Sequence, residues 1–140
     1  MRVVVDTNIL IRAAVGDDPE QEAMATSLLE RAEMIVIPVP ALCEFAWVMG
    51  RSYKIPAAEI ASVIADIVSS ETVVTDMPAV EAGLDLLRAG GDFGDGAIAM
   101  QGTSLGGTVF ASFDRKAVEL WKNRGGQASD PRDLITASDR

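Results

Sequence analysis

Short apolar runs rich in β-branched residues alternate along this chain with longer segments whose apolar residues recur every three or four positions. The short runs are typical of buried strands, and the longer segments of helices with one apolar face. The predicted strands span residues 2–6, 34–37, 72–74, 108–113 and 127–129. The predicted helices span residues 7–15, 19–32, 40–51, 56–70, 77–89, 93–103, 114–124 and 131–137.

This alternation of strands and helices predicts an α/β fold: a three-layer α/β/α domain around a central, mostly parallel sheet. The residues at the predicted helix ends agree with this fold class, because Pro19 follows two aspartates at the start of one helix and Gly90 ends another. No repeat, low-complexity tract or linker is evident. With 140 residues, 49% of them hydrophobic, the chain is expected to form one domain over 1–140 with a buried core.

The apolar runs are too short to cross a bilayer, and the N-terminus enters a strand pattern without a signal-like apolar region. These features predict a soluble, cytoplasmic protein that does not bind membranes. A lone cysteine, Cys43, excludes an internal disulfide and a cysteine metal cluster. It is a poor nucleophile candidate, because the chain has no histidine to activate it.

Four acidic residues stand where predicted strands or apolar helices begin or end: Asp6, Glu44, Asp95 and Asp114. Charged side chains are rare in such apolar surroundings unless they are paired or bind a cation. Two of them, Asp6 and Asp114, follow the carboxyl ends of predicted strands, and ligand sites of open parallel sheets lie beyond those ends. We therefore expect the four carboxylates to converge.

The chemistry of such a cluster favours a divalent ion. Two carboxylates 4 Å apart repel by roughly 4 kcal/mol at an effective dielectric constant of 20. Oxygen ligands without histidine suit a hard ion, Mg²⁺ or Mn²⁺, which would keep waters for an attack on a phosphodiester. The sequence therefore predicts metal-dependent hydrolysis of RNA or DNA.

The net charge of −9 argues against broad electrostatic attraction to nucleic acid. It does not exclude a nuclease, because bound metal offsets part of the charge and a local basic patch would hold phosphates. The residues available for such a patch are Arg12, Arg51, Lys54, Arg115, Lys116 and Lys122.

Four stretches together resemble the PIN-domain ribonucleases: the opening around Asp6, the mid-chain Glu44, residues 92–99 around Asp95, and residues 110–115 around Asp114. The resemblance covers essentially the whole chain. Within that family, the length and the absence of an extra domain are similar to the VapC-type toxins of bacterial toxin–antitoxin pairs. The resemblance implies a PIN-like fold and an Mg²⁺- or Mn²⁺-dependent endoribonuclease.

Carried onto this sequence, the resemblance implies that the four acids are catalytic and bind the metal. It implies that Asn8 and Ser112 support the site by hydrogen bonding, with Ser112 where the family more often has threonine. Asp92 is either an accessory acid or the N-cap of the helix that carries Asp95, and we favour the cap. The implied partners are an RNA substrate, a second copy of the chain in a homodimer, and an antitoxin protein that inserts a basic side chain among the acids.

Other interpretations remain open at this point. Asp6, Asp95 and Asp114 each also fit helix caps, and Glu44 fits a surface position. A haloacid-dehalogenase-like phosphatase would need a second aspartate where Asn8 stands, and a receiver-like domain matches weakly. A non-catalytic PIN-like module retained for dimerisation or partner binding is the main alternative. It would be expected to have lost one or more of the four acids, and all four are present.

Overall fold

The computed structural model describes residues 1–138, and the chain divides into two compact units between Asp76 and Met77. Each unit has its own secondary structure and is described by itself below. The expectation that residues 1–140 act as one domain stays a prediction. Among the described residues, no helix combines the length and the apolar character that a membrane span requires.

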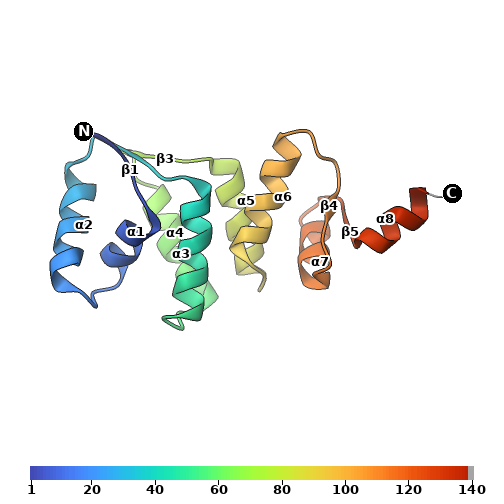
Figure 1. Ribbon diagram of the computed structural model, residues 1–140, viewed down its shortest axis with the longest axis horizontal. Coiled ribbons are helices and arrows are strands. Elements are labelled where there is room, and N and C mark those ends of the chain that lie inside the picture. The colour runs from blue at the N-terminus through green and yellow to red at the C-terminus, as the bar shows by residue number, and fades with distance from the viewer. Residues whose placement is uncertain (139–140) are drawn as a thin grey trace. The chain divides into compact units, whose positions relative to one another are not determined.

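Unit 1, residues 1–76, contains a parallel three-stranded sheet of order β1-β2-β3, of which Figure 1 labels β1 and β3. Val3 pairs with Ile35, and Ile35 pairs with Val73, so these three residues share one face. The strands are β1 (Arg2–Val4), β2 (Met34–Val36) and β3 (Val73–Val74). The helices are α1 (Thr7–Ala14), α2 (Pro19–Arg31), α3 (Val39–Arg51) and α4 (Ala57–Val68).

The core of unit 1 follows the periodicity of its sequence. Ile60 and Ile64, four residues apart on α4, are almost completely buried, as are Leu42 and Phe45 on α3. Burying one such side chain stabilises a fold by about 1.5–3 kcal/mol. The apolar spacing that predicted these helices therefore also supplies the buried side chains of the core.

The described part of unit 2, residues 77–138, contains four helices and a parallel pair of strands in which Phe110 pairs with Ala128. The helices are α5 (Met77–Arg88), α6 (Phe93–Ser104), α7 (Arg115–Asn123) and α8 (Pro131–Ser138). The strands are β4 (Phe110–Ala111) and β5 (Ala128–Ser129). Trp121 of α7 is buried in this core and meets Phe110 edge to face, with ring centroids 6.4 Å apart.

The structure confirms the predicted α/β class, because the paired strands run parallel and helices flank the three-stranded sheet. Every predicted element is present, within one to a few residues of its predicted bounds. The largest difference is the strand predicted over 108–113, which is reduced to Phe110–Ala111. Its partner β5 offers two residues, and Ser112 already caps the turn into α7 by accepting a hydrogen bond from the Asp114 amide.

Close packing of α5 on α6 depends on Gly96. A Cβ at this position would overlap the backbone carbonyl of Ala82 in α5. We expect Gly96→Ala to force the helices apart and to lower the free energy of unfolding by about 1–3 kcal/mol. Gly102→Ala, in the same helix with open space around the added methyl group, is the matched control and should stabilise the protein by about 0.5–1 kcal/mol. Chemical denaturation of both variants measures the difference, and equal effects would contradict the close approach.

Candidate metal centre

Asp6 stands at the turn between β1 and α1 and is the N-cap of that helix. Its Oδ1 accepts a hydrogen bond from the Thr7 amide at 2.6 Å, and its side chain faces solvent. The first amides of a helix have no partner within the helix, so an aspartate here stabilises the helix start. One carboxylate oxygen of Asp6 is thereby fixed by the backbone.

Glu44 lies on α3 and is linked to the same turn through Thr7. The Thr7 hydroxyl donates a 2.6 Å hydrogen bond to Oε2 of Glu44, while Thr7 itself is 5% exposed. Two acids from distant parts of the sequence therefore flank one buried threonine. Sequence reasoning missed Thr7; the signal that was available is a hydroxyl residue directly after the acid that ends the first strand.

In unit 2, Asp92 is the N-cap of α6, and its Oδ2 accepts a hydrogen bond from the Asp95 amide at 3.3 Å. The capping interpretation of Asp92 is therefore confirmed. Asp95 lies in the first turn of α6 and is half-buried. Its pKa is raised above the ordinary value, first by burial and then by the negative charges of Asp92 and Asp114.

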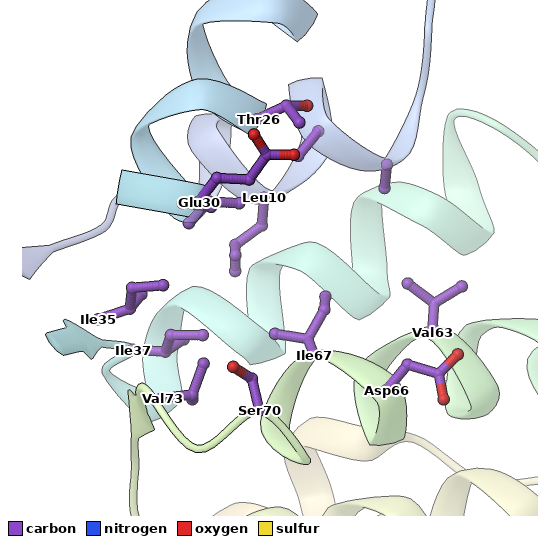
Figure 2. A pocket seen from close by; sticks show the side chains of 13 residues that line it. Leu10, Thr26, Glu30, Ile35, Ile37, Val63, Asp66, Ile67, Ser70 and Val73 are labelled. Carbon is purple, nitrogen blue, oxygen red and sulfur yellow. The ribbon is translucent and has the colours of Figure 1, made fainter. Parts of the chain in front are cut away.

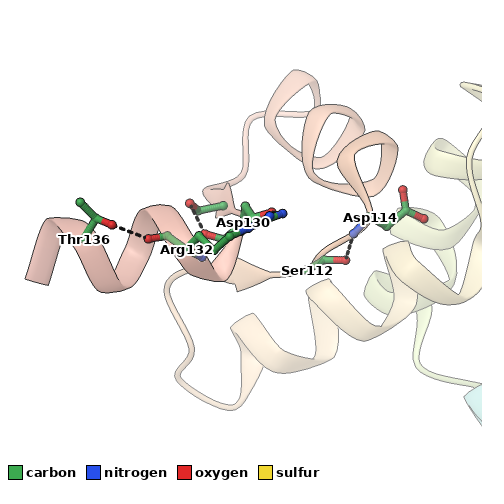
Figure 3. Close-up of polar contacts among 6 residues, drawn as sticks. Ser112, Asp114, Asp130, Arg132 and Thr136 are labelled. Atoms are coloured by element: carbon green, nitrogen blue, oxygen red, sulfur yellow. Dashed lines mark hydrogen bonds and ion pairs between the residues drawn. The ribbon is translucent and has the colours of Figure 1, made fainter.

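Asp114 is the N-cap of α7, and its Oδ1 accepts hydrogen bonds from the amides of Lys116 and Ala117 at 3.0 and 3.2 Å. Among the described residues, its Oδ2 accepts no hydrogen bond. The Ser112 hydroxyl accepts a hydrogen bond from the Asp114 amide at 3.0 Å (Figure 3). Ser112 therefore fixes the turn that presents Asp114. Asn8 lies exposed in the first turn of α1 and lines a cleft with Arg12.

These carboxylates suit a hard divalent ion, since every candidate donor is an oxygen. In unit 1, Asp6 and Glu44 flank Thr7, and in unit 2, Asp92 and Asp114 act electrostatically on Asp95. The described residues form no ready-made group of three or more metal-ligating side chains. The convergence of all four acids on one ion stays a prediction.

An apolar cavity of about 440 Å³ also lies in unit 1, and none of the four acids lines it. Figure 2 shows Leu10 of α1 and Ile67 of α4 directed into this space from opposite sides, with Ile35 and Val73 of the sheet beside them. Glu30 and Asp66 are the acids among the lining residues. The cavity suits apolar groups and is separate in chemistry from the candidate metal centre.

Thr7→Val tests the link between Asp6 and Glu44. It keeps the shape of the side chain but removes the hydroxyl donor, so we expect unfolding free energy to fall by about 1 kcal/mol. We also expect Mg²⁺ or Mn²⁺ affinity, measured by titration calorimetry, to fall about tenfold as Glu44 loses its orienting partner. Thr75→Val is the control, because Thr75 donates a similar 2.7 Å hydrogen bond to the Ile37 carbonyl instead of to an acid. Equal losses of metal affinity in both variants would show that Thr7 does not position Glu44.

No curated protein matches this sequence. The sequence model of the PIN domain matches residues 3–122, which is most of the chain and contains Asp6, Glu44, Asp95 and Asp114. The chain therefore belongs to the PIN-domain family, a superfamily of metal-dependent nucleases.

Proposed function

We propose that this protein is an endoribonuclease that acts as the toxin of a type II toxin–antitoxin pair. The observation that carries the enzymatic part is the PIN-domain match over residues 3–122, a stretch that contains all four acids. Helix capping explains Asp6 and Asp114, but Glu44 and Asp95 cap no helix, so a non-catalytic module would have no structural need to keep all four acids. The toxin role and the choice of RNA rest on the resemblance of the motifs around these acids to VapC-type toxins.

The four carboxylates, Asp6, Glu44, Asp95 and Asp114, together bind Mg²⁺ or Mn²⁺ in this proposal. The bound ion would polarise the phosphodiester and lower the pKa of a coordinated water. Asp6 and Asp114 each use Oδ1 for helix amides, which leaves Oδ2 directed by a fixed side chain. Thr7 orients Glu44 in the same way. Each of these three side chains is therefore held by hydrogen bonds within its own unit.

The proposed antitoxin partner is basic where it meets the acids, since an inserted Arg or Lys would relieve their mutual repulsion. The apolar cavity of unit 1 is a suitable place for the apolar side chains of the same partner. Glu30 and Asp66 beside that cavity, and the net charge of −9, favour a basic segment there.

A homodimer is also part of the proposal. Trp47 on α3 is 56% exposed and suits a contact between two copies of the chain.

Asp6→Asn and Asp114→Asn separate the charge of these residues from their capping role. Asparagine caps a helix about as well as aspartate, so both variants should fold normally. We expect each to reduce RNA cleavage by at least about a hundredfold, because a metal ligand loses its charge. The measurement is cleavage of a cellular RNA pool with Mg²⁺, with Mn²⁺ and with chelator.

The matched control is Asp18→Asn. Asp18 caps α2 by accepting a hydrogen bond from the Gln21 amide at 3.1 Å, so it has the same structural role but is not one of the four acids. Its cleavage rate should equal that of the unaltered protein. Full turnover by folded Asp6→Asn or Asp114→Asn protein, or cleavage that persists in chelator, would refute the proposal.

Metal binding should also change stability. Folding raises the pKa of Asp95, so ionisation of this carboxyl lowers the free energy of unfolding at pH values above the raised pKa. This loss of stability disappears as the pH falls below the ordinary value of 3.8, because Asp95 is then protonated in both the folded and the unfolded state. We therefore expect Asp95→Asn to melt at a higher temperature than the unaltered protein at pH 7 in chelator. Magnesium at a hundred times its dissociation constant should stabilise the unaltered protein by about 2.7 kcal/mol and Asp95→Asn by much less. Calorimetric melts that do not respond to Mg²⁺ would argue against the metal site.

A further inference from the structure

A second cleft, of about 430 Å³, opens in unit 2 beside the turn that carries Asp114. It is lined from the ends of β4 and β5, from α7 and from the start of α8. Phe113, the residue directly before Asp114, lines it and is 73% exposed. Exposed single apolar side chains are common, so exposure alone assigns Phe113 no role.

The environment of Phe113 supplies the second observation. The guanidinium carbon of Arg132 lies 5.9 Å from the centre of the Phe113 ring, which is within the range of a cation–π contact. The cleft thus contains an aromatic ring and a planar cation side by side, and Phe113 is otherwise open to solvent.

Arg132 is held in place by Asp130. Its Nε and Nη2 donate to the two carboxylate oxygens of Asp130 at 2.9 and 2.7 Å, and its amide donates to Oδ1 at 2.8 Å (Figure 3). Arg132 lowers the pKa of Asp130 to about 2, so the pair stays ionised at any physiological pH. Among the described residues, Nη1 of Arg132 has no acceptor. The guanidinium is therefore oriented in advance and keeps a donor for a ligand.

The charges around the cleft indicate which kind of contact it makes. The lining has as many cations as carboxylates: Arg115, Lys122 and Arg132 against Glu119, Asp130 and Asp133. This balance differs from the net charge of −9 of the whole chain, so the side chains that line the cleft do not by themselves repel a polyanion. A neutral surface gives little general attraction to phosphate, and stacking on Phe113 becomes the main source of affinity.

We propose that Phe113 and Arg132 form a stacking site for one unpaired RNA base next to the phosphodiester that is cleaved. The inference rests on the proposed nuclease function. Phe113 directly precedes Asp114 in the chain, so the cleft and the Asp114 carboxylate belong to one turn and a single RNA strand can reach both. Arg132 orders the ring and offers Nη1 to the base edge. Phe113 acts on substrate placement and leaves the chemical step to the acids.

The test compares Phe113→Ala, Phe113→Leu and Phe113→Tyr in the full-length protein. Binding of fluorescent single-stranded RNA is measured by anisotropy in chelator, and KM and kcat are measured with metal. Phe113→Ala and Phe113→Leu remove the aromatic ring, so each should weaken RNA binding and raise KM about tenfold. The kcat of both variants should change less than about twofold. Tyrosine keeps the ring and should behave like phenylalanine.

Leu105→Ala is the matched control, because Leu105 is 90% exposed in the same unit and does not line the cleft. It should bind and cleave RNA normally. If the unaltered protein neither binds nor cleaves RNA, the proposed function fails and this inference with it. If the unaltered protein cleaves RNA and Phe113→Ala or Phe113→Leu does so with the same KM, the stacking site alone is refuted. If Phe113→Ala or Phe113→Leu loses affinity for a protein partner but keeps its affinity for RNA, the surface belongs to that partner and the stacking site is also refuted.

Discussion

The amides at the start of a helix need acceptors, and in this protein that requirement fixes three carboxylates, two of which belong to the proposed metal site. Asp6, Asp92 and Asp114 each stand at an N-cap and accept a hydrogen bond from the first turn of α1, α6 or α7. A carboxylate has two oxygens, so the one that caps the helix orients the one that remains. Each of these three carboxylates therefore keeps one oriented oxygen beyond its capping bond.

Capping and metal binding are therefore compatible roles, and the four acids are held in two different ways. Asp6 and Asp114 are fixed by backbone amides at a stabilising position. Glu44 and Asp95 cap no helix; Thr7 orients the first, and partial burial near other acids raises the pKa of the second. A cation that offsets the charge on Asp95 gains affinity from relieving this unfavourable state.

The sequence predicted the features that depend on neighbouring residues. The spacing of apolar residues predicted helices α4 and α5, and an aspartate just before an apolar helix predicted the N-cap at Asp92. The sequence did not predict features that depend on residues far apart in the chain. The length of β4 is set by its pairing with β5, and the hydrogen bond from Thr7 to Glu44 joins residues 37 apart. The half-burial of Asp95 likewise depends on packing that no local pattern reports.

An acidic nuclease has to bind a polyanion against its own charge, and the local arrangement of unit 2 indicates how. Proteins that bind RNA through many Lys and Arg contacts lose affinity steeply as salt rises, because binding releases counterions. With equal numbers of cations and carboxylates around Phe113, that contribution is small, and stacking depends little on salt. In the proposed nuclease, an exposed ring beside Asp114 would select the substrate while the protein keeps its negative surface, and that surface suits the proposed basic partner.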